Sequence, residues 1–275
     1  MPINSAAEIC EEILSSKKYA TLHKPMILRV CEQEYKKYSN TKERIKGTKN
    51  TLHAMYGAYL FNESYKKANK LLDVAISDKK CLINTEHQNY PANELEKILR
   101  LHASTKERLP NLKEFYQFIF DNTGPAESIL DIGCGFNPFT LPFFPKMPSK
   151  YHALDIDTRI ADLNNRYFAA INLPELSGCA DIAVSTPDIS ADVVFLFKLL
   201  PLIDRQIKGR SANLLKELKA KFFVVTYPTK TLTGKEKGMQ SFYAAAFKDV
   251  LGGNFTVAAS KEIGTELVYI VVNMI

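Results

Sequence analysis

The sequence predicts an α/β fold in which a mostly parallel sheet follows a helical N-terminal region. Two observations support this prediction. Apolar residues recur at helical spacing over 6–119 without strand signals, whereas β-rich runs alternate with helix-length stretches after residue 125. Since strands separated by helices are joined through crossovers, the second region is expected to form a parallel sheet.

The N-terminal region is expected to be a cluster of short helices. Ile9 and Ile13 are spaced by one helical turn, and the polar stretch 84–93 marks a break between helices. A further helix over 109–120 is expected to pack on the fold that follows. We therefore predict a helical, basic domain over residues 1–105 and a second domain over 106–275.

Short runs rich in β-branched and aromatic residues predict the strands of the second domain. They lie at 128–132, 151–156, 192–197, 222–227, 255–260 and 267–272, with a weaker run near 176–182 and expected helices at 160–170 and 211–220. Only 261–266 separates the last two strands, which is too short for a crossover helix, so these strands must be antiparallel. A parallel sheet ending in one reversed strand is typical of the class I, Rossmann-like methyltransferase fold.

Positive charge is concentrated in the first domain. The net charge is +6, and residues 1–105 contain 17 Lys and Arg against 12 Asp and Glu, whereas residues 106–275 contain 19 against 18. A basic segment suits a polyanionic partner because phosphate contacts release counterions. An ordinary solvated helical surface is the alternative explanation.

Other features of the composition exclude several classes of protein. No segment approaches the roughly 20 consecutive apolar residues that cross a bilayer, and the acidic N-terminus does not resemble a signal peptide. The five cysteines are scattered, which argues against a disulfide framework or a metal site and for a reducing compartment. We expect a cytoplasmic protein without membrane segments or metal.

The strongest local motif is an apolar strand that runs into two closely spaced glycines, over 129–135. Glycines there let the backbone bend sharply and let a ligand approach closely. A dinucleotide fingerprint needs a third glycine where this chain has Pro138, which disfavours a nicotinamide enzyme. Asp131, ahead of Gly133 and Gly135, instead suits S-adenosylmethionine, because that cofactor carries a cationic amino group.

Two further carboxylates follow in the order that such a cofactor needs. Asp155 ends the second predicted strand, where a carboxylate can accept hydrogen bonds from ribose hydroxyls. Asp181 near the third strand could accept from the adenine amino group, although either aspartate alone could be a helix cap or turn residue. Upstream, Arg108 could bind the cofactor carboxylate bidentately, and a solvated helix face is its alternative role.

Taken with these residues, six motifs resemble the aminoglycoside-resistance 16S ribosomal RNA methyltransferases, which modify N7 of a decoding-centre guanine. They are HASTKERL at 102–109, DIGCGFNP at 131–138, FKLLP at 197–201, PTKTL at 228–232, GKEKGM at 234–239 and IGTELVY at 263–269. The stretches 16–19 and 52–59 extend the likeness into the helical region.

The resemblance implies that Arg108 holds the cofactor carboxylate, Asp155 the ribose and Asp181 the adenine. It extends the expected cofactor site to His102, Thr105, Asn137, Ile156, Ile182, Phe197 and Lys198. It also implies that the N-terminal helices dock on the assembled small ribosomal subunit. We expect the enzyme to act as a monomer.

On the target side, Lys198 and Glu266 are the candidate catalytic residues. Lys198 follows an apolar strand and could donate to guanine O6 or a phosphate, while a carboxylate at Glu266 could accept from guanine N1–H or the N2 amino group. Expected RNA contacts are Lys17, Lys18, Lys230, Lys235, Lys237, Met239 and Tyr243, and the candidates for stacking on a flipped base are Phe136, Phe139, Tyr227 and Tyr243.

Some residues of the target-side loop depart from the family pattern. Phe242 stands where the family commonly has asparagine, Tyr227 where phenylalanine is usual, and Lys248 where an acidic residue is frequent. Two alternatives therefore stay open. One is a methyltransferase of this fold that acts on another RNA or a small molecule, and the other is a cofactor- and RNA-binding relative without catalysis.

Overall fold

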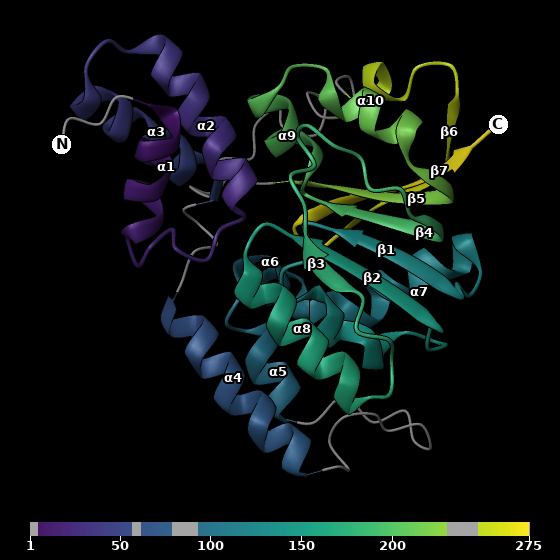
Figure 1. The fold of residues 1–275 in the computed structure, drawn as a ribbon. Coiled ribbons are helices and arrows are strands. Elements are labelled where there is room, and N and C mark those ends of the chain that lie inside the picture. The colour runs from purple at the N-terminus through teal and green to yellow at the C-terminus, as the bar shows by residue number, and fades with distance from the viewer. Residues whose placement is uncertain (1–4, 57–61, 79–92, 230–246, 275) are drawn as a thin grey trace.

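A seven-stranded sheet in the order β3-β2-β1-β4-β5-β7-β6 forms the centre of the protein (Figure 1). The computed structural model describes residues 5–56, 62–78, 93–229 and 247–274. The strands are β1 Ser128–Ile132, β2 Lys150–Asp155, β3 Ser177–Cys179, β4 Ser190–Phe197, β5 Lys219–Pro228, β6 Phe255–Ile263 and β7 Glu266–Asn273. Strands β1 to β5 pair in parallel and β7 is antiparallel to both its neighbours, which confirms the predicted sheet.

Helices cover both faces of the sheet (Figure 1). One face carries α7 (Leu112–Thr123) and α8 (Thr158–Ala170), and the other carries α9 (Leu200–Gln206) and α10 (Arg210–Glu217). Because side chains alternate along a strand, Ile129 of β1 joins the first core while its neighbour Leu130 joins the second. The strands are thus buried on both sides, as a parallel sheet requires.

Several predicted boundaries were wrong by a few residues. The helix expected over 211–220 ends at Glu217, because Lys219 and Ala220 already pair with β4 as part of β5. The last hairpin has a turn of two residues rather than six, since β6 extends to Ile263, which pairs with Glu266 at the start of β7. These strands extend beyond their apolar runs because backbone hydrogen bonding between strands continues through polar residues.

The N-terminal region contains two groups of helices with different cores. Helices α1 (Ala6–Ser15), α2 (Lys24–Lys37) and α3 (Thr41–Tyr56) share a core of their own. In contrast, α4 (Asn62–Ser77) and α5 (Asn93–Leu99) insert apolar side chains into the core that α7 and α8 form on one face of the sheet. The short helices α6 (Ala103–Arg108), η2 (Leu109–Asn111) and η3 (Asn137–Phe143) complete the fold. The boundary at residue 105 stays a prediction.

The unit formed by α1 to α3 is attached beside the carboxyl end of β2. Leu22 forms an antiparallel bridge with Asp157, and the His23 amide donates to the Ile156 carbonyl at 2.7 Å. The Thr158 amide donates back to Thr21 at 2.9 Å. Within the described ranges, every helix is too short or too polar to span a bilayer.

Candidate active site

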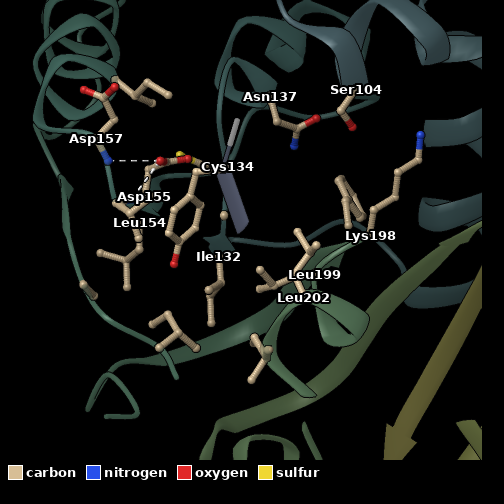
Figure 2. A pocket seen from close by; sticks show the side chains of 18 of the residues that line it. Ser104, Ile132, Cys134, Asn137, Leu154, Asp155, Asp157, Lys198, Leu199 and Leu202 are labelled. Atoms are coloured by element: carbon tan, nitrogen blue, oxygen red, sulfur yellow. Dashed lines mark hydrogen bonds between the residues drawn. The ribbon is translucent and has the colours of Figure 1, made fainter. Parts of the chain in front are cut away.

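A pocket of about 1080 Å³, open solvent at its mouth included, lies at the carboxyl ends of β1, β2 and β4. Sheets of this type bind ligands at that edge. In Figure 2, Asp155 and Asp157 lie on one side of the pocket, and Ser104 and Lys198 on the opposite side. The predicted cofactor residues that line it are His102, Thr105, Arg108, Gly133, Asn137, Asp155, Ile156, Asp181, Ile182, Phe197 and Lys198.

The turn after β1 needs both its glycines. Gly133 and Gly135 have φ angles of 70° and 50°, in the left-handed region that side chains disfavour. A Cβ on Gly135 would lie 2.8 Å from the His102 ring, which is closer than non-bonded atoms approach. The turn therefore presents backbone without a side chain to the pocket at Gly133, whereas Gly135 does not line the pocket.

Asp155 is held at the tip of β2 by backbone amides. Its carboxylate accepts hydrogen bonds from Gly135 at 2.9 Å and from Ile156 at 2.7 Å. Burial raises the pKa of Asp155, while these amide donors oppose the rise by stabilising the charged form. The carboxylate is thus fixed in orientation and faces the pocket as a hydrogen-bond acceptor.

Asp181 lies at the other end of the same wall, and its partner comes from the N-terminal unit. Arg29 of α2 donates from Nε to Asp181 Oδ2 at 2.6 Å and from Nη2 to Oδ1 at 3.1 Å. Arg29 also donates to Gln206 at 2.8 Å. Arg29 was not predicted as a site residue, because no local pattern distinguishes it from other arginines on a helix.

Arg108 and Glu266 form a buried bidentate ion pair beside the pocket. Nε and Nη2 of Arg108 each donate to a different oxygen of Glu266 at 3.0 Å, and the two side chains are 3% and 2% exposed. Nη1 of Arg108 donates to Asn137 at 3.1 Å. Glu266 lies behind Arg108 and does not line this pocket, and its predicted contact with the target guanine stays a prediction. A buried carboxylate needs such a cationic partner.

Asp131 is also behind the wall of the pocket. It accepts hydrogen bonds from Tyr151 at 2.7 Å and from Asn137 at 2.9 Å, and it is 1% exposed. Burial raises the pKa of Asp131 to about 6. Its predicted contact with the cofactor amino group stays a prediction, and Asn137 is the residue that links Asp131 to the pocket surface.

Lys198 has an unusual backbone at the end of β4. Its φ of 56° lies in the left-handed region, which costs a residue with a side chain roughly 1 kcal/mol or more. The side chain reaches Glu107 at 2.7 Å and Glu266 at 3.3 Å, and it is 11% exposed. Two carboxylates therefore hold the ammonium group at the pocket edge.

The predicted RNA contacts are only partly described. Lys17 and Lys18 are exposed between α1 and α2. The remaining predictions lie outside the described residues, namely Lys230, Lys235, Lys237, Met239 and Tyr243. Three of the stacking candidates, namely Phe136, Phe139 and Tyr227, are buried in the packed cores and do not lie on an open surface. Large aromatic side chains stabilise a fold most when they are buried.

The pocket also contains residues that were not predicted. Ser104 lines it from α6, inside the motif at 102–109, so that motif could have indicated it. Tyr56 and Gln206 line it from the ends of α3 and α9. Their positions depend on packing between distant segments, which sequence spacing does not reveal.

Comparisons with known proteins match this architecture. Residues 15–270 match the family described as Ribosomal RNA methyltransferase (FmrO). The chain belongs to this family. A protein named 16S rRNA (guanine(1405)-N(7))-methyltransferase from Proteus mirabilis is 33% identical to it over 98% of this chain and 97% of the relative. A protein of the same name from Serratia marcescens is 32% identical over 98% of both chains.

Solved structures agree with the predicted fold of this ribosomal RNA methyltransferase. The 16S rRNA methyltransferase RmtF in complex with S-adenosyl-L-homocysteine superposes with a TM-score of 0.87 at 30% identity, covering 99% of this chain and all of the other. The 16S rRNA methylase RmtB gives 0.82 at 29% identity with similar coverage. The predicted family and the class I fold with its helical N-terminal region are confirmed.

Proposed function

We propose that this ribosomal RNA methyltransferase transfers a methyl group from S-adenosylmethionine to N7 of a decoding-centre guanine in 16S rRNA, which gives aminoglycoside resistance. The observation that carries the proposal is the polarity of the pocket. Carboxylates of Asp155 and Asp181 line one side, and the cations of Arg108 and Lys198 lie at the other. The relatives named for guanine N7 of 16S rRNA support the choice of target.

The residues present fit the cofactor. Asp155 offers an acceptor to the ribose hydroxyls and Asp181 to the adenine amino group, while Ile156 and Ile182 supply apolar surface for the base. Arg108 is the cation for the cofactor carboxylate. The bound cofactor supplies an electrophilic methyl group on a sulfonium.

The chemistry at guanine needs positioning rather than proton removal. N7 carries a lone pair, so the nucleophile requires no general base, and catalysis rests on alignment and electrostatics. Lys198 is the group that we assign to this task. Its ammonium is held at the pocket edge by Glu107 and Glu266, where it can donate to guanine O6 or a neighbouring phosphate.

The N-terminal helices are proposed to dock on the assembled small subunit, with Lys17 and Lys18 among the contacts. Both are exposed, and the first 105 residues carry most of the excess positive charge. Contacts of this kind bind phosphates irrespective of sequence. We further propose a cytoplasmic monomer that needs no metal.

Expression in aminoglycoside-sensitive bacteria tests the proposal. Wild-type protein should raise gentamicin and kanamycin tolerance, and primer extension should map the modified guanine in 16S rRNA. Lys198→Ala should abolish both while calorimetry still detects S-adenosylhomocysteine binding. Lys219→Ala is the matched control, since Lys219 pairs with Asp188 on the surface away from the pocket.

Asp155→Ala should weaken S-adenosylhomocysteine binding in the same calorimetric assay, because the fixed acceptor for the ribose is lost. Unmodified 16S rRNA together with intact cofactor binding by the wild type would refute the proposed reaction. That result would favour a non-catalytic relative or a methyltransferase with a different target.

A further inference from the structure

The adenine end of the proposed cofactor site is built from two separate parts of the chain. Asp181 follows β3 in the sheet domain, whereas its guanidinium partner Arg29 lies in α2 of the N-terminal unit, 152 residues earlier. Gln206, at the end of α9, accepts from the same guanidinium and lines the pocket. Helices α2 and α9 lie side by side at this point (Figure 1).

The Arg29 contact fixes the plane of the Asp181 carboxylate. Two parallel hydrogen bonds, at 2.6 and 3.1 Å, engage both oxygens, and the Ala183 amide donates to Oδ1 at 3.3 Å. A bidentate pair has a defined geometry that a single contact lacks. The side chains of Arg29 and Asp181 are only 13% and 6% exposed, so the pair is shielded from solvent.

Because the pair is shielded from solvent, stabilisation of the fold does not by itself explain why the pair is present. Removing two charges from water costs about as much as their attraction returns, so buried pairs contribute little net stability. Such pairs can instead specify geometry, and Asp181 lines the pocket while Arg29 approaches it from outside. Oδ1 of Asp181 already accepts two hydrogen bonds, whereas Oδ2 accepts one and has a second lone pair for a ligand.

We propose that Arg29 is a positioning residue that aims the Asp181 carboxylate at the 6-amino group of the cofactor's adenine. The N-terminal unit is thereby part of the cofactor site. This inference rests on the proposed function, since it takes the pocket to bind the adenosyl group. Two backbone hydrogen bonds join the unit to the segment after β2, one from the His23 amide to Ile156 and one from the Thr158 amide to the Thr21 carbonyl. Together with Tyr56 in the pocket wall, they hold the unit in the position that the Arg29 contact requires.

The orientation of the Asp181 carboxylate determines which base the site prefers. An amino group at position 6 donates to a carboxylate, whereas a 6-oxo group presents a second acceptor and is repelled. A correctly aimed Asp181 therefore favours S-adenosylhomocysteine over S-inosylhomocysteine. Hydrogen bonds to charged groups of this kind are strong enough for a preference on the order of tenfold or more.

Calorimetry with these two ligands tests the proposal on the 275-residue chain. Wild type should prefer the adenosyl ligand at least about tenfold, and Arg29→Gln should lose most of that preference. Arg29→Lys retains the charge but not the two-point contact, so its preference should be intermediate. Arg44→Gln is the matched control, because Arg44 bonds the Tyr38 carbonyl within the same unit and lies off the pocket wall.

Several outcomes would overturn the proposal. An undiminished preference in folded Arg29→Gln would show that Arg29 does not aim Asp181. Equal losses of affinity for both ligands would indicate general loosening of the site. If Arg29→Gln does not fold, a wild-type preference in Arg29→Lys would decide against the inference. Failure of the wild type to bind S-adenosylhomocysteine would refute the proposed function, and the inference with it.

Discussion

At the scale of single residues, the dominant feature is a buried polar network next to the cofactor pocket. Arg108 occupies its centre, with Glu266 on one side and Asn137 on the other, and Asn137 continues to Asp131. Charges in such a place are stable only together, because each would otherwise be stranded in a low-dielectric interior. The proposed cofactor ligand Arg108 is therefore also a structural residue.

Removal of one member of the Arg108–Glu266 pair should lower the free energy of unfolding more than removal of both. Glu266→Gln leaves a buried guanidinium uncompensated and should lower the free energy of unfolding by about 3 kcal/mol. The double variant Arg108→Met/Glu266→Gln, which combines this change with the single variant Arg108→Met, leaves no such charge and should lose less free energy of unfolding than Glu266→Gln alone. Urea unfolding of both singles and the double measures this, and additive losses would show that the side chains are not coupled.

A second residue-scale prediction concerns pH. Burial, with repulsion from Arg108 and Lys198, lowers the pKa of His102 to about 4. The unfolded chain, with a histidine pKa of about 6.5, takes up a proton that the folded protein refuses as pH falls through this window. His102 therefore destabilises the folded state progressively between about pH 6.5 and pH 4, and has no such effect above it.

Comparison with His102→Gln isolates this effect from other groups. Burial raises the pKa of Asp131 to about 6, which stabilises the folded state over part of the same range and masks the histidine in the wild type. From pH 7 to about pH 4.5 the wild type should lose about 2 kcal/mol relative to the variant. Urea unfolding at the two pH values measures it, and parallel changes in both proteins would exclude His102 as the source.

At the scale of elements, the turn after β1 depends on conformation as much as on space. Gly135→Ala combines a φ of 50° with a Cβ only 2.8 Å from the His102 ring. It should lower the free energy of unfolding by roughly 1–3 kcal/mol and weaken S-adenosylhomocysteine binding. Gly178→Ala in β3 is the matched control, because its Cβ would meet nothing nearer than 3.9 Å. Equal effects of the two substitutions would contradict this account.

Elements with a strong local pattern could be predicted from the sequence, but the residues at which they begin and end were predicted less accurately. The apolar run before Gly133 gave β1 over the residues observed, because a buried strand has a dense local signature. Strand β5 begins at Lys219, inside a stretch of helical character, and only pairing with Ser190 of β4 makes it a strand. Tertiary pairing of this kind overrides local propensity.

Individual site residues were predictable where a motif determines the backbone. Asp155 follows from its place at the end of β2. Pairings across the chain were not, since Arg108 meets Glu266 158 residues away and Arg29 meets Asp181 152 residues away. Such contacts arise from packing of distant elements, and a single sequence contains no spacing that reports them.

At the scale of the whole molecule, the boundary between the hydrophobic cores does not coincide with the boundary of the basic N-terminal third. Helices α1 to α3 bury Ile9, Met26 and Leu52 against one another. Helices α4 and α5 bury Leu72 and Ile98 in the core of the sheet domain. The basic N-terminal third thus contains one unit with its own core and a second that completes the sheet domain.

This division predicts different outcomes for two truncations. A chain that starts at residue 62 keeps α4 and α5, and should give a folded protein with near-ultraviolet circular dichroism and one cooperative thermal transition. A chain that starts at residue 106 exposes the apolar face that these helices cover, and should aggregate or bind a hydrophobic dye. Soluble, cooperative folding of the shorter chain would show that α4 and α5 are dispensable to the sheet domain's core.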